Sequence, residues 1–126
     1  MVYELQHDPV DIEYKEICRK WIRILKALRA ENACLIDSLA GALKGTMHRP
    51  FVEEAEQFQL TILDREEVLV LLRHEVAELL EWLENRPQER PAPQRYVTLK
   101  RDMEMMIREC KRAREAFLIF MASVKV

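Results

Sequence analysis

Apolar residues recur at alternating steps of three and four along three stretches of the chain, with polar residues between them. The stretches cover residues 9–44, 50–85 and 93–124, and each of them opens on a proline. This period is that of an α-helix with one buried stripe, and proline is favoured in the first turn of a helix. The pattern therefore predicts three long amphipathic helices.

The two connections indicate how these helices are arranged. Residues 45–49 and 86–92 are short, polar segments that contain glycine or proline. Helices of about 50 Å, at ~1.5 Å per residue, with short loops between them favour antiparallel neighbours. We expect an all-α, up-down-up antiparallel three-helix bundle with coiled-coil-like packing. A continuous coiled coil across a connection is the competing arrangement, and the prolines and glycine at the connections disfavour it.

A polar step interrupts each of the first two stripes. It consists of Glu31 and Asn32 in the first stripe and of Arg65 in the second. Antiparallel pairing across the first connection places Asn32 opposite Arg65, and Ala113 of the third stripe reaches the same level. We expect a polar core layer of Glu31, Asn32 and Arg65 whose side chains satisfy one another and fix the register of the helices. A ligand or ion site in the core is the alternative.

Length and composition limit the class of protein. The chain has 126 residues, of which 49% are hydrophobic, and it contains only two glycines. This is enough chain for one domain with its own core and no metal or disulfide support. Charged residues nearly cancel to a net charge of −2, so no overall charge attracts the chain to nucleic acid or to an anionic membrane.

The cysteines and the termini bear on the compartment. Cys18, Cys34 and Cys110 are odd in number and widely spaced, which disfavours disulfides and zinc ligation, so we expect buried, reduced thiols. The first eight residues lack the basic and apolar blocks of a signal peptide. The longest apolar run, residues 116–122, is far shorter than the ~20 residues of a membrane span. We expect a cytoplasmic protein with no membrane contact.

No set of residues predicts catalysis or metal binding. His74 and Glu78 share a helix face, but no glutamate precedes His74 by three residues as in the Glu-x-x-His motif of di-metal bundles. The serines and cysteines have no histidine at a spacing that suits nucleophilic catalysis. A chain with only two glycines has no glycine-rich loop that could bind a phosphate. We therefore expect a non-enzymatic protein without cofactor or metal.

Charge is distributed unevenly over the three stretches. Residues 51–86 hold ten acidic and three basic residues, whereas residues 93–124 hold four acidic and seven basic ones. An acidic middle helix between more basic neighbours favours ion pairs at the helix margins. The alternative is a nucleic-acid-associated accessory protein that binds phosphates through basic rows without interleaved aromatics. These rows are Arg19, Arg23 and Lys26 in the first stretch, and Arg101, Arg108 and Arg112 in the third.

The second stretch is more hydrophobic than a single buried stripe requires. Leu60, Leu63, Val70 and Leu71 form a further apolar row, roughly opposite the stripe. Such a row is typical of a surface that packs against another helix. We expect a small adaptor-like or chaperone-like module that binds protein, either a second copy in a homo-oligomer such as a homodimer or a helical partner.

Overall fold

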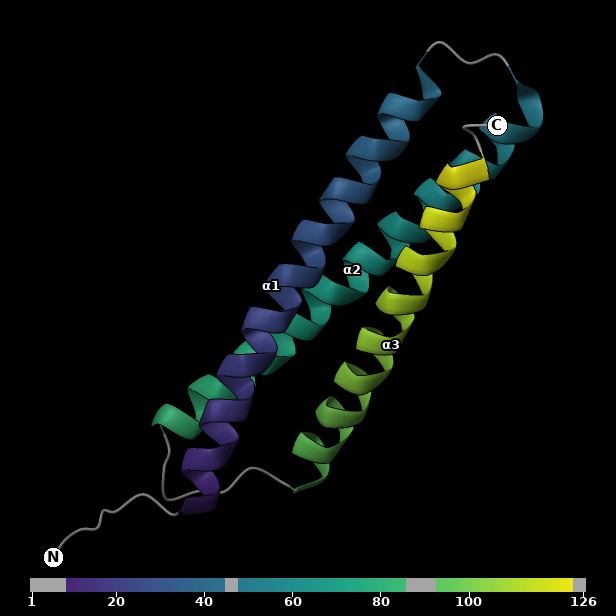
Figure 1. Ribbon diagram of the computed structural model, residues 1–126. Helices are drawn as coiled ribbons and strands as arrows, with labels where there is room; N and C mark the ends of the chain where they lie inside the picture. Colours follow the sequence, from purple (N-terminus) through teal and green to yellow (C-terminus); the bar gives the residue numbers. More distant parts are fainter. Residues whose placement is uncertain (1–8, 45–47, 86–92, 124–126) are drawn as a thin grey trace, which may run out of the picture.

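The computed structural model describes residues 9–44, 48–85 and 93–123. It contains helices α1 (Pro9–Leu43), α2 (Arg49–Asn85) and α3 (Pro93–Ser123), which pack together (Figure 1). The prediction of an all-α protein with three helices is confirmed. Each helix begins and ends within one residue of the range expected from its stripe, and the two connections lie almost wholly outside the described residues.

The described helix ends follow ordinary capping rules. The carbonyl of His48 accepts a hydrogen bond from the Val52 amide at 3.1 Å, so α2 begins at Arg49, one residue before the expected start. Pro50 tolerates this position because the first amides of a helix need no partner within it. At the end of α1, the Lys44 amide donates to the Gly41 carbonyl at 3.3 Å, which tightens the last turn.

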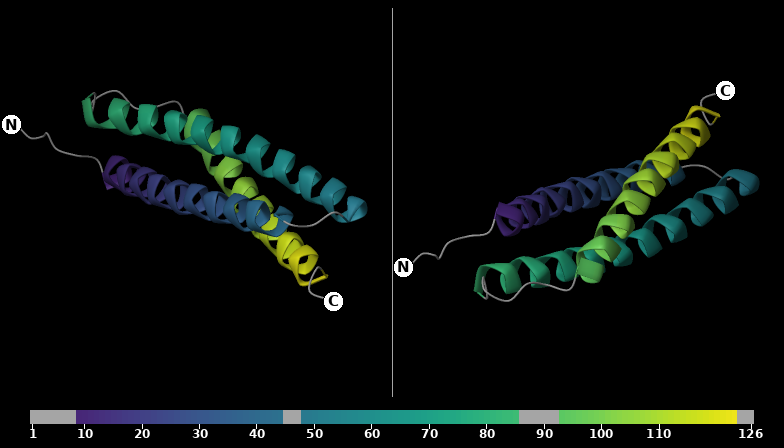
Figure 2. Two further views of the ribbon diagram at one scale, coloured as in Figure 1. Left: turned by 90° about the horizontal axis from the view of Figure 1, so that it is seen from above. Right: turned by 90° about the horizontal axis from the view of Figure 1, so that it is seen from below.

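Two ion pairs join α1 to α2. Arg19 binds Glu84 at 2.8 Å, and Arg29 binds Glu66 at 2.7 Å. Residue numbers rise along α1 while those of the partners fall along α2, so the two helices run in opposite directions. Both views of Figure 2 show them side by side along most of their length.

The third helix runs in the same direction as α1. Tyr96 near its start stacks on Tyr14 at a ring distance of 4.2 Å, and Arg114 further along donates to Glu31 at 2.9 Å. Both views of Figure 2 show α3 lying obliquely across one face of the α1–α2 pair.

The buried hydrophobic side chains form two separate groups. The first core cluster lies where α1 and α3 begin and α2 ends, and the second lies at the opposite end of the molecule. The first core cluster comprises Cys18, Trp21, Leu25, Leu69, Leu72, Val76, Leu79, Leu83, Leu99, Met103, Met106 and Cys110. The second core cluster comprises Leu35, Leu39, Phe51, Ala55, Ile62, Phe117 and Phe120. Along each helix these residues are separated by three, four, seven or ten positions, the spacing that the predicted apolar stripes require.

Aromatic rings hold α3 against its neighbours near both of its ends. At its start, Tyr96 stacks between Tyr14 and Trp21 of α1. Near its end, Phe120 stacks on Phe51 and Phe58 of α2, at ring distances of 5.0 and 4.8 Å. Aromatic pairs of this kind stabilise beyond the area that they bury. The oblique helix is therefore fixed at two points far apart.

Within the described residues, none of the helices has an apolar stretch long enough to cross a bilayer.

Candidate interaction surface and polar core layer

The residues expected to form a polar core layer lie between the two core clusters. Asn32 is buried, with 4% of its surface exposed, and is the only polar residue buried to this degree in the described chain. Arg65 is half-buried, and its Nη1 atom is shielded from solvent. On either side of this level, Leu25 and Leu69 belong to the first core cluster, whereas Leu35 and Ile62 belong to the second.

The three predicted polar residues do not satisfy one another. Neither the Asn32 Nδ2 atom nor the Arg65 Nη1 atom has a hydrogen-bond partner within the described chain. Glu31 instead accepts a hydrogen bond from Arg114 of α3 at the margin of the bundle. One residue of an α-helix turns the side chain by about 100°, so Glu31 points toward α3 while its neighbour Asn32 points into the core. The expectation of a closed three-residue network was wrong.

The charge of Arg65 acts on a thiol of α3. Burial raises the pKa of Cys110, and the Arg65 guanidinium opposes this by stabilising the thiolate. Glu31 and Glu109 each raise the pKa further, since a second negative charge nearby is unfavourable. Arg65 of α2, Glu31 of α1 and Cys110 of α3 are therefore electrostatic neighbours at one level of the molecule.

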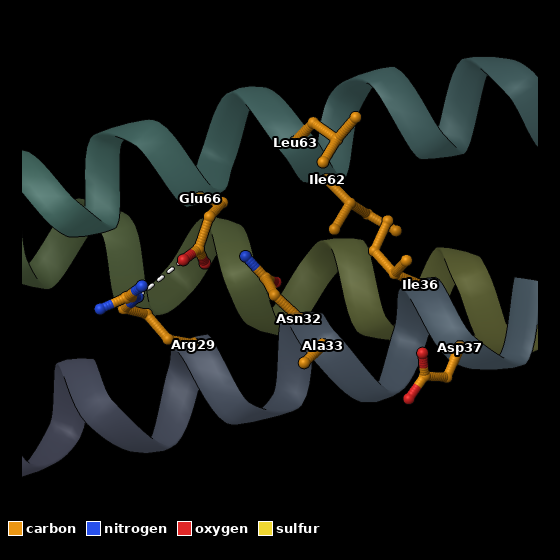
Figure 3. Close-up of a pocket in the computed structure, with 8 residues that line it drawn as sticks. All are labelled: Arg29, Asn32, Ala33, Ile36, Asp37, Ile62, Leu63 and Glu66. Atoms are coloured by element: carbon orange, nitrogen blue, oxygen red, sulfur yellow. Dashed lines mark hydrogen bonds and ion pairs between the residues drawn. The ribbon is translucent and has the colours of Figure 1, made fainter.

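A groove of about 260 Å³ opens between α1 and α2 at the same level (Figure 3). Its apolar wall is formed by Ala33, Ile36, Ile62 and Leu63, and α3 lies behind it in the close-up. The groove therefore occupies the face of the α1–α2 pair that α3 leaves uncovered. An apolar hollow of this size can accept a side chain or a small ligand.

Polar side chains gather at one end of this groove. The Arg29–Glu66 ion pair crosses from α1 to α2, and the amide nitrogen of Asn32 points toward the Glu66 carboxylate (Figure 3). The Glu66 Oε1 atom is buried and has no hydrogen-bond partner in the described chain. Glu66 and Arg114 thus add ion pairs at the margin of the bundle to the predicted set. The antiparallel pairing of α1 with α2 could have predicted that Glu66 lies at this level, because Glu66 directly follows Arg65 in the sequence.

The additional apolar row of α2 lies on the surface. We call Leu60, Leu63, Val70 and Leu71 the α2 outer row; their exposed fractions are 56%, 48%, 45% and 62%. Leu63 also lines the groove, so the outer row continues into it without a break. Glu67 lies within the row and is exposed. The arrangement is an apolar strip with acidic residues along it.

The histidine and glutamate that were considered for metal binding, His74 and Glu78, lie on the surface as well. The His74 Nε2 atom is 3.5 Å from a Glu78 carboxylate oxygen, and both side chains are more than half exposed. In the part of the chain that the structure describes, histidine, cysteine and acidic residues form no cluster suited to a metal ion.

The sequence pattern predicted burial wrongly for one of the three cysteines. Cys18 and Cys110 are buried, as expected, but Cys34 is exposed and all three are free thiols. Cys34 lies two residues from Asn32 along α1 and therefore faces away from the core. Burial raises the pKa of the Cys18 thiol to about 11, although Arg19 and Arg95 lower it in part. The buried thiols are thus held in the protonated form.

Comparison with known proteins gives no relative: no family model, curated protein or solved structure matches this chain.

The polar core layer leads to a stability prediction. Replacing both Asn32 and Arg65 by leucine removes two buried nitrogen atoms without partners, so we expect the free energy of unfolding to stay equal or to rise by about 1–3 kcal/mol. Leu35→Asn is the matched control because it places an amide in the purely apolar second cluster, and we expect it to lower stability by about 2 kcal/mol or more. Urea unfolding measures all three values. A large loss in the double variant would contradict this interpretation.

The cysteines lead to a labelling prediction. At neutral pH, a thiol reagent should modify Cys34 rapidly and react with Cys18 and Cys110 only when the protein unfolds, because these two are buried and protonated. Mass spectrometry should therefore find one label on the native protein and three after denaturation. Cys34→Ser should abolish the fast reaction. Three rapid labels on the folded wild type would contradict the burial of the other two.

Proposed function

We propose that this protein is a non-enzymatic, cytoplasmic interaction module that associates with itself through α2. The observation that carries the proposal is the exposure of the α2 outer row, four large apolar side chains in a single strip. Soluble monomers seldom expose a contiguous apolar strip unless it binds something. Burial of such side chains stabilises a complex by roughly 25 cal/mol per Å² of apolar surface before the cost of association is subtracted.

The groove beside the row supports the same function. Leu63 lines the groove and belongs to the α2 outer row, so one incoming helix can contact the strip and place a side chain in the hollow. Amphipathic helices dock on apolar grooves in this way, with anchors three, four and seven residues apart. Coiled-coil-like packing with an up-down-up order, which the helix lengths favour, presents this strip along a straight and rigid support.

The polar core layer fits a supporting role in this proposal. A buried amide and a guanidinium disfavour other registers, because sliding the helices would move them into apolar surroundings. A fixed register keeps the four side chains of the outer row in one line. The layer thus acts on the interface indirectly, through the position of α2.

A nucleic-acid-associated accessory protein is the second candidate. It is favoured by Arg101, Arg108 and Arg112, which are exposed on α3 and have no ion-pair partner in the described chain. Phosphate binding weakens steeply as salt is added, whereas an apolar helix interface does not. Electrophoretic mobility of a labelled duplex at low and high salt therefore separates the two candidates.

The proposed function predicts that Leu60→Glu with Leu63→Glu converts an associated wild type into a folded monomer, because two charges would have to be buried in the interface. The matched control is Thr61→Glu with Val68→Glu, which adds the same charge to exposed positions of α2 outside the outer row. This control should associate like the wild type. Sedimentation equilibrium gives the mass of each protein, and circular dichroism reports folding.

Two results would contradict self-association through the outer row. One is a wild type that remains monomeric at every concentration reached, which would leave the strip to a different protein. The other is equal loss of association in the control variant, which would show that added charge alone is responsible.

A further inference from the structure

The exposed face of α3 carries charge opposite to that of α2. Along α3, Arg101, Arg108 and Arg112 lie on one exposed stripe together with apolar side chains. The apolar members of this stripe are Val97, Met105 and Ile119, all of them large exposed hydrophobic residues. Positions four, four, three, four and seven residues apart fall on one side of a helix. The α3 outer face, defined by these six residues, is thus basic and apolar, with the exposed residues Glu104 and Glu115 along its margin.

The α2 outer row presents the complementary pattern. Glu67 and Glu78 lie on the same side of the helix as Leu60, Leu63 and Leu71, and all five are exposed. Over residues 49–85 the helix holds ten acidic and three basic residues, whereas α3 holds four acidic and seven basic ones. The row is therefore an apolar strip with acidic residues, which matches an apolar strip with basic residues.

This charge pattern argues against pairing the α2 outer row with itself. Two copies of α2 face to face would bring glutamates such as Glu67 close to those of the other copy, and like charges across an interface are unfavourable. The arginines on the α3 outer face are not neutralised by ion pairs among the described residues. Among the described residues, Arg101, Arg108 and Arg112 have no ion pair, whereas Arg95 and Arg114 each bind a glutamate.

We propose that the α2 outer row binds the α3 outer face of a second copy of this chain. This inference rests on the proposed self-association through α2 and specifies its partner surface. With the two helices antiparallel, a single register places Leu60 opposite Ile119 and Glu67 opposite Arg112. The same register places Glu78 opposite Arg101, so one apolar level and two charged levels match, whereas Leu71 lies opposite Arg108.

A contact between unlike faces has a consequence for assembly. Each copy uses its α2 row on one neighbour and offers its α3 face to another, so copies add head to tail and close into a ring where the rotation between neighbours permits it. The smallest closed ring has two copies, in which each α2 row meets the α3 face of the other copy. The site is complete only between copies, because the row and the face of one molecule lie on different helices.

Charge reversal on each face tests this contact. The first variant, Arg101→Glu with Arg112→Glu, makes the α3 outer face acidic; the second, Glu67→Arg with Glu78→Arg, makes the α2 row basic. Each variant alone should self-associate about tenfold or more weakly than the wild type, since two attractive levels become repulsive. An equimolar mixture should recover association close to that of the wild type, because each variant then meets its opposite charge.

The matched control is Arg23→Glu with Lys26→Glu, the same change in charge on exposed residues of α1, and it should associate like the wild type. Sedimentation velocity with one fluorescently labelled component measures association, and circular dichroism checks that each variant is folded. Glu78 also binds Arg95, but that pair is half-exposed, and loss of such surface pairs seldom affects folding.

The outcomes separate this inference from the proposed function. Weak association of each variant alone and recovery in the mixture support the α2–α3 contact. Wild-type association by the first variant, while Leu60→Glu with Leu63→Glu is monomeric, overturns this inference but keeps self-association through α2. Failure of the mixture to recover also overturns it. A monomeric wild type overturns both.

Discussion

A buried amide and a shielded guanidinium nitrogen lie in the middle of an otherwise apolar bundle. Asn32 and Arg65 occupy the level where the first core cluster ends and the second begins. Polar atoms at this depth cost free energy when they lack hydrogen bonds, and they cost more if the helices slide and carry them into an apolar cluster. We infer that this level ties α1 to α2 in one register.

The rest of the molecule is arranged around that level. The margins of the bundle add the pairs Arg29–Glu66 and Arg114–Glu31, one to α2 and one to α3. Aromatic stacks then hold α3 near its two ends, and α3 covers only one face of the α1–α2 pair. The uncovered face contains the groove, and the α2 outer row lies beside it. The same geometry that fixes the core thus determines which surfaces are left for partners.

The helical period of the sequence predicted the helices and the core because a bundle of long helices depends almost wholly on local pattern. Residues such as Leu69 and Met103 could be assigned to the core from spacing alone, and both are fully buried. Cys34 was misassigned because a small, weakly polar residue next to a stripe carries little information about its side of the helix. The partners of Glu31 and Glu66 were missed because long side chains at helix margins reach residues on another helix that no period specifies. The oblique course of α3 likewise depends on ring packing at its ends.

Measuring the register of α1 and α2 with and without the polar level tests most directly whether that level fixes it. Native Cys34 provides one spin-label site on α1, and Glu81→Cys provides an exposed site on α2 about five helical turns further along the bundle, while Cys18 and Cys110 remain buried. Pulsed electron paramagnetic resonance should give one narrow distribution of distances between the two spin labels when Asn32 and Arg65 are both present. With Asn32→Leu and Arg65→Leu added, we expect a broader distribution, including distances displaced by about 5 Å, one helical turn. An unchanged narrow distribution would contradict the claim that the polar level fixes the register.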